Sequence, residues 1–549
     1  MWKGGGMLAY TLCFRHEKHG SLFALWVGAP SSRCFRSLIL SPELVSGGKV
    51  LMNALLGEGS HFYCMAAIGE SLVRQNHSVT MLISNAFEHR AKDEKYSHIF
   101  AFEVFNHTIP LEDVHGQFDA FNRRAFSSAT LQMRTLLEIM KDGRAIDCDT
   151  ILGDQRFMNR LRDSSYDILV YDVIWYCGPL IAKSIGIPYL TLVSFPSPCT
   201  YSDIYLWDGS MNPSYVPEVF SGFTNKMTFG QRILNVLQTF LIMGVVYDLK
   251  KPYEELIDKY NITKDSIADV MAQNELFLMN TDFAHEFPCP LHPKLKPVGG
   301  LTTRPSAPLS PELETFMESS GEHGVIVCTT GTYFTDVPIR IVKAFSEAFA
   351  QLPQKVVWQL AAELDDIPNN VRVLPWIPQN DILGHPKTKV LLYQGGNNGL
   401  FEAIYHAVPL VTFPIHADQY DVGARVVARG IGRNIDKRTI TADVLLEALQ
   451  DVISNSSYRQ AMNRVSAIFH DRPQRPADRA AFWVEHAMKH GGSYLDSTSY
   501  GLNYFQRNLI DVYLFIGSFL CAVCWLLYRI LKAFISFCIF RFSRHRKSE

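Results

Sequence analysis

Residues 375–419 read PWIPQNDILGHPKTKVLLYQGGNNGLFEAIYHAVPLVTFPIHADQ, and this stretch decides the predicted fold. A β-rich run at residues 389–392 precedes a glycine-rich turn at residues 395–399. Residues 400–406 have the composition of a helix, and residues 408–413 form a second apolar run. The stretch therefore predicts a strand, a glycine turn, a helix and another strand, as in an α/β fold with a parallel sheet.

The glycine turn is a candidate anion site. A turn that opens a helix after a buried strand gathers backbone N–H groups at the positive helix end, which suits a diphosphate. The alternative is that the turn only reverses the chain. Polar residues favour the anion site, because Trp376 and Gln379 precede the turn and Glu402 follows it in the helix. Asp418 and Gln419 then follow the next strand.

With these spacings, the stretch resembles the signature of the UDP-glycosyltransferases, the family that includes the UDP-glucuronosyltransferases, without insertion or deletion. The resemblance implies that Trp376 stacks on uracil, that Gln379 hydrogen-bonds the nucleotide and that Glu402 accepts from the ribose hydroxyls. Around the diphosphate it implies roles for Gln394, Gly396, Asn398 and Gly399. It also implies that Asp418 and Gln419 hold the sugar hydroxyls.

Three positions, in two segments, depart from the family pattern. Members usually have Thr-His before Gly-Gly, with the His contacting phosphate, whereas this chain has Tyr393 and Gln394. Gln can donate a hydrogen bond but carries no positive charge. Many glucuronate-using members have an Arg where this chain has Asn280, so we expect a neutral UDP-hexose to compete well with UDP-glucuronate. UDP-glucuronate remains the leading single donor that the resemblance implies.

A second β-α-β unit is predicted from residue 49 onward. Residues 49–56 read as a strand, residues 61–75 as a helix and residues 78–84 as the next strand. His61 stands at the carboxyl end of the first strand, where open α/β sheets bind ligands. A lone His is often structural, but the Gly-Ser-His-Phe setting resembles the family's catalytic base. Imidazole suits that role because its pKa lies near neutral pH.

Asp172 ends the predicted buried strand 167–172. It is either a helix N-cap or, as the resemblance implies, the partner that orients the ring of His61. Thr332 follows the predicted strand 324–330, and it is either a helix cap or the family's phosphate- or sugar-facing hydroxyl.

Composition limits the classes of function. The chain has 549 residues and a formal charge of -2, which argues against a nucleic-acid partner. Its 11 Cys are scattered, so we expect neither a disulfide scaffold nor a zinc site, and no metal or cofactor. Glycosylation sequons at Asn76, Asn106, Asn261 and Asn455 favour a lumenal location weakly.

The two ends of the chain point to a membrane protein. Residues 1–47 contain short apolar runs and are either an atypical secretory signal or an error in the assigned gene start. Residues 509–531, with a charge-free core at 512–528, are predicted to span the membrane, and the basic tail 532–549 to lie in the cytosol. The tail also resembles an endoplasmic-reticulum retrieval signal. The apolar run 237–247 is too short to span, and lines the acceptor pocket or touches the membrane surface.

We therefore predict the GT-B fold of two facing Rossmann-like domains, at residues 48–288 for the acceptor and 289–495 for the UDP-sugar, plus one C-terminal transmembrane helix. Residues 286–301 resemble the family's interdomain linker. The predicted activity is hexosyl transfer to a small lipophilic acceptor with inversion. The predicted protein is a single-pass glycoprotein of the endoplasmic-reticulum membrane, with its catalytic part in the lumen. It is a monomer or a homo- or hetero-oligomer. The alternative is a catalytically silent UDP-sugar- or lipid-binding partner subunit, which Tyr393 and Gln394 favour and His61 with Asp172 oppose.

Overall fold

Short runs of β-branched and aromatic residues alternate with helices along the chain, and these runs form the strands of two parallel sheets. The computed structural model describes residues 47–545 except 55–58, 125, 127–137, 140–142, 207–210, 332–336 and 362–365. The predicted leader 1–47 and Thr332 therefore lie outside the described residues, apart from residue 47. Most strand residues are buried, as expected for parallel sheets covered by helices on both faces.

The first sheet has seven strands in the order β3-β2-β1-β4-β5-β6-β7. They are β1 (Lys49–Asn53), β2 (Ser78–Ser84), β3 (Ala101–Phe105), β4 (Ile168–Asp172), β5 (Tyr189–Val193), β6 (Phe277–Met279) and β7 (Leu295–Pro297). The second sheet has six strands in the order β10-β9-β8-β11-β12-β13. They are β8 (Val325–Thr329), β9 (Lys355–Gln359), β10 (Val371–Leu374), β11 (Thr388–Tyr393), β12 (Leu410–Thr412) and β13 (Gly432–Asn434).

The strand order places a switch point in each sheet. In the first sheet β1 pairs with β2 on one side and β4 on the other, so the connections that follow β1 and β4 diverge. In the second sheet β8 pairs with β9 and β11 in the same way. A crevice forms at the carboxyl ends of strands where the order reverses, and ligands bind there.

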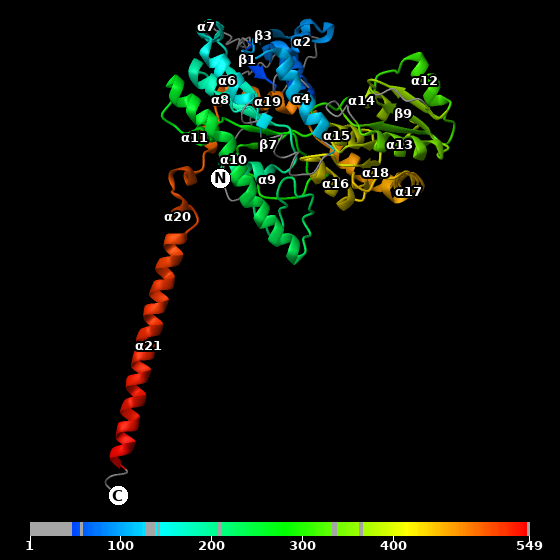
Figure 1. Cartoon of the computed structure of the whole chain (residues 1–549). Coiled ribbons are helices and arrows are strands. Elements are labelled where there is room, and N and C mark those ends of the chain that lie inside the picture. The colour runs from blue at the N-terminus through cyan, green and yellow to red at the C-terminus, as the bar shows by residue number, and fades with distance from the viewer. Residues whose placement is uncertain are drawn as a thin grey trace, which may run out of the picture. The chain divides into compact units, whose positions relative to one another are not determined.

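Helices connect the strands and cover both sheets (Figure 1). In the first half of the chain they are α1 (Gly59–Arg74), α2 (His89–Lys92), α3 (Glu94–Ser97), α4 (Leu111–Arg124), α6 (Arg144–Gly153), α7 (Gln155–Asp163), α8 (Cys177–Ile185), α9 (Pro198–Leu206), α10 (Phe229–Tyr260) and α11 (Ile267–Ala272). In the second half they are α12 (Pro311–Glu318), α13 (Ile339–Ala350), α14 (Gln379–Leu383), α15 (Asn397–Tyr405), α16 (Gln419–Ala428), α17 (Ala442–Ser454), α18 (Ser456–His470), α19 (Pro476–His490), α20 (Tyr504–Arg507) and α21 (Ile510–His545).

The expected domain limits at 288 and 495 do not coincide with the sheets. β7 lies in the predicted linker yet forms an edge of the first sheet. α19 packs against α1, and Figure 1 shows it in orange among the blue and cyan elements of the first sheet. Ser71 of α1 donates to Asp478 of α19 at 2.6 Å (Oγ to Oδ1). The C-terminal part of the chain therefore returns to cover the first sheet.

The expectation of no disulfide scaffold is wrong. Cys148 of α6 is bonded to Cys177 at the start of α8, and Cys199 of α9 is bonded to Cys289. The paired residues are 29 and 90 positions apart, so the fold and not local spacing brings them together. Disulfides persist in oxidising compartments, and this pairing therefore agrees with a lumenal chain.

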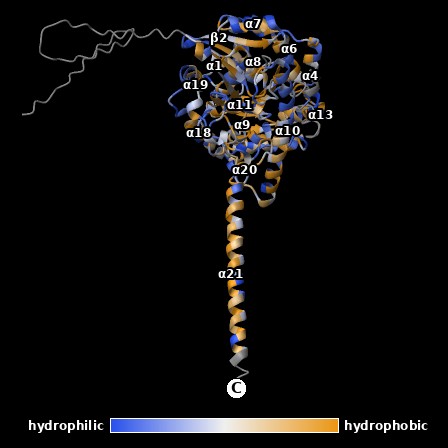
Figure 2. Cartoon of the chain, turned by 90° about the vertical axis from the view of Figure 1, so that its left-hand side faces the viewer, coloured by the Kyte–Doolittle hydropathy of each residue, from blue (hydrophilic) through white to orange (hydrophobic). Residues whose placement is uncertain are grey.

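Two helices are long and apolar enough to cross a membrane by length and composition, within α10 and within α21. The C-terminal turns of α10 pack through Tyr253, Leu256 and Ile257 into the hydrophobic core beside the first sheet. The whole of α10 therefore cannot span a membrane. The apolar part of α21 is exposed along its length, and Figure 2 shows the helix mostly in the hydrophobic colour. α21 is longer than expected, because it continues past residue 531 through the first basic residues of the tail.

Candidate functional site

A cavity of about 630 Å³ lies where elements from both sheets meet. It is lined by these predicted site residues: His61, Trp376, Gln379, Gln394, Gly396, Asn398, Gly399, Glu402, Asp418 and Gln419. Asp172 is behind this lining, in contact with His61. All predicted site residues that the structure describes therefore gather at one cavity.

His61 and Asp172 form a buried pair at the switch point of the first sheet. α1 is the helix that follows β1 in the chain and has His61 in its first turn, and Asp172 is the last residue of β4. The His61 Nδ1 atom lies 2.5 Å from Asp172 Oδ2. Asp172 Oδ1 also accepts from the Ile174 N–H at 3.1 Å, and the Phe195 ring packs edge-on against the imidazole. These contacts fix the ring and leave Nε2 available to a ligand.

The surroundings of His61 control its protonation. Burial lowers the pKa of His61, but the charge and hydrogen bond of Asp172 outweigh burial, so the net pKa is raised above its ordinary value. Asp418 on the opposite wall of the cavity adds a smaller effect in the same direction. A general base must be unprotonated, so activity that depends on this base should increase as pH rises through the raised pKa.

Asp172→Asn should shift the pH range in which activity increases. Without the carboxylate, burial still lowers the pKa of His61 and the attraction that raised it is lost, so the acidic side of the kcat/KM profile should shift to lower pH. The maximal kcat/KM at high pH should also fall, because an amide does not stabilise the imidazolium. The pH profiles of the two proteins, measured with one donor and one acceptor, provide the test. The exposed Asp163→Asn is the control, and an unchanged pH range in Asp172→Asn would contradict the assigned pair.

The nucleotide end of the cavity contains a buried acid. Gln379, the first residue of α14, donates to Glu402 of α15 at 2.7 Å (Nε2 to Oε2), and Thr302 donates to Oε1 at 3.5 Å. Burial raises the pKa of Glu402 to about 7. Trp376 is 55% exposed at the rim, so one face of its indole is open for stacking on a planar base.

The glycine turn leads directly into α15. Gly395 has a φ of +97°, a conformation that side chains rarely tolerate, and Gly396 is the N-cap residue. The helix begins at Asn397, three residues earlier than expected, so residues 397–399 form its first turn. The first N–H groups of a helix have no intrahelical partner, and those of α15 therefore remain available to an anion at the cavity wall.

Gln394 lines the cavity and packs closely against Gly331 and Gly396. An added Cβ at Gly331 would lie 2.2 Å from Gln394 Nε2, so the glycine makes room for this amide. Among the described residues, the buried Gln394 Oε1 atom has no hydrogen-bond partner. Gln394 therefore lies beside the glycine turn and offers an amide without a charge.

Asn398 connects the two halves of the molecule. Its Nδ2 donates to the Ser60 carbonyl at 3.3 Å, and its Oδ1 accepts from Cys64 Sγ at 3.2 Å and from Asn280 Nδ2 at 3.3 Å. Asn280 is fully buried behind the cavity wall, where its Oδ1 accepts from the Gly300 N–H at 3.0 Å. Asn280 therefore does not line the cavity. Its lack of charge gives no reason to expect that a neutral UDP-hexose competes with UDP-glucuronate.

Cationic side chains that the sequence argument missed line the cavity: Arg74, Lys95, Arg304 and Arg475. Each already has an acidic partner. Arg304, for example, makes two contacts with Asp381, at 2.6 and 2.8 Å. A donor carboxylate could share these cations, so the sequence offers no reason to exclude UDP-glucuronate. No local spacing indicates them, because they come from four separate segments.

Asp418 and Gln419 lie at the start of α16, on the same cavity as His61. Burial raises the pKa of Asp418 to about 6, and the proximity of His61 opposes this shift. Gln419 Oε1 accepts from the N–H groups of Ile415 and His416 at 2.9 and 3.2 Å, which fixes the loop before α16. The remaining amide and the Asp418 carboxylate suit the hydroxyls of a hexose.

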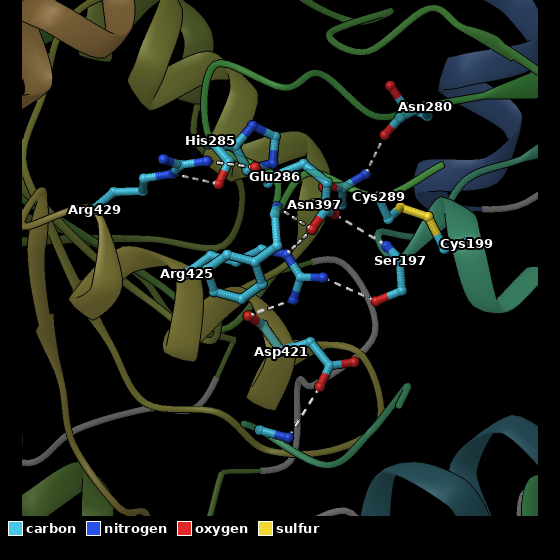
Figure 3. A network of polar contacts seen from close by, with 12 residues as sticks. Ser197, Cys199, Asn280, His285, Glu286, Cys289, Asn397, Asp421, Arg425 and Arg429 are labelled. Carbon is cyan, nitrogen blue, oxygen red and sulfur yellow. Dashed lines mark hydrogen bonds and ion pairs between the residues drawn. A yellow bond between two sulfur atoms is a disulfide. The ribbon is translucent and has the colours of Figure 1, made fainter. Parts of the chain in front are cut away.

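α16 is anchored to the first half of the molecule by a buried polar network (Figure 3). Arg425 Nε lies 2.6 Å from Glu286 Oε1, and Arg425 Nη2 donates to Ser197 Oγ at 2.9 Å. The Asp421 carboxylate accepts from the N–H groups of Phe220 and Gly222. The Cys199–Cys289 disulfide joins the two segments that carry Ser197 and Glu286. This network holds the helix that begins at Asp418 and Gln419.

Comparisons with known proteins identify the family and the fold of the chain. The family described as UDP-glucoronosyl and UDP-glucosyl transferase matches residues 48–547. UDP-glucuronosyltransferase 2A1 of Mus musculus is 32% identical over 91% of this chain and 95% of its own length. UDP-glucuronosyltransferase 2B7 of Homo sapiens shows the same identity and coverage.

The spinosyn forosaminyltransferase SpnP has a solved structure with a TM-score of 0.57 at 15% identity, over 81% of this chain and 100% of its own. The glycotransferase of kitacinnamycin has a TM-score of 0.55 at 19% identity, over 80% and 98%. The predicted GT-B fold is confirmed.

Proposed function

Because the chain belongs to the UDP-glucuronosyl and UDP-glucosyl transferase family, we propose that it transfers a hexose from a UDP-sugar to a hydroxyl of a small lipophilic acceptor, with inversion. The observation that carries this proposal is that the buried His61–Asp172 pair and the Gln379–Glu402 pair border one cavity. One pair supplies a base, and the other a nucleotide contact.

The proposed reaction needs only side chains and the helix end at this cavity. His61 Nε2 takes the proton of the acceptor hydroxyl, and Asp172 stabilises the imidazolium. The acceptor oxygen forms a bond to the anomeric carbon as the bond from that carbon to the diphosphate oxygen breaks, and UDP leaves with the bonding electrons. The N-terminus of α15 stabilises the charge on the departing diphosphate. Asp418 and Gln419 hold the sugar, and no cofactor is assigned.

Product analysis tests this function. The purified chain, UDP-glucuronate and a phenolic acceptor should yield a glycoside whose anomeric configuration is opposite to that of the donor. A product with retained configuration, or only the free sugar, would contradict a single displacement at this site. The same reactions with UDP-glucose, UDP-galactose and UDP-N-acetylglucosamine determine the donor.

Glu402→Ala should weaken UDP binding about tenfold to a hundredfold, because it removes an acceptor for the ribose hydroxyls and leaves Gln379 without its partner. Quenching of tryptophan fluorescence during a UDP titration measures the effect, with Trp376 as the expected reporter. The exposed Glu322→Ala is the control. Equal UDP affinity in Glu402→Ala and the unchanged chain would remove Glu402 from the nucleotide site.

We further propose a single-pass protein of the endoplasmic-reticulum membrane, with α21 as the span and the globular part in the lumen. Basic residues collect toward the C-terminal end of α21, which favours the cytosol for that end. All four sequon asparagines are exposed.

In microsomes, this topology should give a glycosidase-sensitive mass and a C-terminal epitope that external protease removes. An epitope protected until detergent is added would place the tail in the lumen and overturn the orientation. The Asn76→Gln, Asn106→Gln, Asn261→Gln and Asn455→Gln variants show which sequons carry the glycans.

A further inference from the structure

A second cavity, of about 390 Å³, lies among α9, α10 and α11. It shares no lining residue with the first cavity. Its walls are mostly apolar, and Ile204, Ile242, Met243 and Val246 supply much of the lining. Specific binding pockets for small molecules have volumes of about 300–1,000 Å³ and combine such apolar walls with a few polar groups. The cavity therefore has the size and character of a ligand site.

Two lysines line this cavity: Lys251 is exposed, and Lys250 is buried. Lys250 of α10 lines it and is only 9% exposed. Among the described residues the Lys250 ammonium has no hydrogen bond or ion pair, and its Nζ lies over the face of the Tyr205 ring, 5.6 Å from the centroid. Burial lowers the pKa of Lys250 to about 8. A largely buried lysine in an apolar cavity without a carboxylate at ion-pair distance is unfavourable, so an anionic ligand head would stabilise it.

Two acids also line the cavity, but both have other contacts. Glu254 Oε1 accepts from the Ile267 N–H, at the start of α11, at 3.0 Å. Glu218 Oε1 accepts from the Val219 N–H at 3.0 Å. Glu254 and Asp269 attract Lys250 through space, yet in the described part of the chain no carboxylate lies within ion-pair distance of the ammonium. Space for a further anion therefore remains next to Lys250.

The cavity opens next to an exposed apolar surface. Met243 and Tyr247 line it and are themselves 42% and 78% exposed. Toward its N-terminus α10 exposes further large apolar side chains, among them Phe229, Leu237 and Phe240. Exposed apolar surface of this extent marks a contact with lipid or with an apolar ligand. An amphiphile could pass along this surface into the cavity.

We propose that this cavity is a second binding site, separate from the catalytic one, for a long-chain fatty acid. The hydrocarbon chain lies against the apolar walls, and the carboxylate pairs with the Lys250 ammonium. This occupant satisfies both the apolar lining and the buried cation, whereas a neutral lipid would leave the cation unpaired.

Fluorescent fatty-acid binding tests the proposal on the full chain in nanodiscs, with protein-free nanodiscs subtracted. The unchanged protein should bind cis-parinaric acid at least about tenfold more tightly than its uncharged methyl ester, because only the acid pairs with the lysine. Lys250→Met should remove this preference, and Lys250→Arg should keep most of it. The exposed Lys264→Met is the matched control and should behave as the unchanged protein does.

A second variant separates loss of the site from loss of folding. Met243→Trp fills the cavity from its exposed edge, and should weaken the binding of both acid and ester while UDP binding is retained. An acid preference that persists in Lys250→Met would overturn the proposal. Displacement of the bound acid by UDP and a phenolic acceptor together would also overturn it, since the probe would then be in the catalytic cavity.

Discussion

His61→Ala is expected to lower kcat by roughly 10²–10⁴-fold, because it removes the base that takes the acceptor proton. The affinity for UDP should change little, since His61 lies on the wall formed by the first sheet and Glu402 and Gln379 lie on the wall formed by the second. Initial rates of UDP release and a UDP titration on the same preparation measure the two quantities. This division between turnover and binding distinguishes loss of a base from general damage.

The control for this variant is His98→Ala, an exposed histidine that does not line the cavity. It should retain the turnover of the unchanged chain. If His61→Ala also retained near-normal turnover, His61 would have no part in the mechanism. A parallel loss of UDP affinity would indicate that the substitution disturbs the cavity as a whole.

Glu286→Ala is expected to cost about 3–5 kcal/mol of folding free energy, because it leaves the Arg425 guanidinium buried without its partner. The thermal unfolding midpoint should fall by about 5 °C or more. Glu447→Ala is the matched control, since it removes the exposed partner of Arg433 and should cost about 1 kcal/mol or less. Similar midpoints for the two variants would show that the network does not hold α16.

The Glu286 pair also predicts a pH dependence. Burial raises the pKa of Glu286, but Arg425 and the hydrogen bonds outweigh it and leave the net pKa below its ordinary value. A carboxyl with a depressed pKa stabilises the fold at neutral pH and loses this effect as pH falls through the acidic range. Part of the acid sensitivity of unfolding should therefore be absent in Glu286→Ala.

Strand periodicity and glycine turns predict β1, β2, β4, β8, β11 and β12, and the position of His61 after the first strand. The pattern cannot show where helices begin when capping is done by backbone, which is why α15 begins earlier than predicted. Contacts between distant segments were not predictable either. Asn280 was assigned to the sugar by alignment with the family alone, and only the tertiary structure shows that it is buried beneath Asn398.

The polar network of α16 shows the same limit. Glu286 and Arg425 are 139 positions apart, and no local pattern connects them. Cys199 and Cys289 likewise meet only because β5 and β6 are neighbours in the first sheet. Residues at strand ends can be assigned from sequence, because strand order places them at one edge. Residues that join the two halves depend on packing that a single sequence does not specify.

Acceptor-dependent release of UDP by the purified full-length chain is the most direct test of the proposed transfer. We expect UDP-sugar alone to yield little UDP, and a lipophilic phenol to raise the rate with at least one of the four donors and not in His61→Ala. Binding of UDP without release above the acceptor-free rate, for all four donors and for both phenolic and lipid acceptors, would contradict catalysis. That result would identify the chain as a silent UDP-sugar-binding protein.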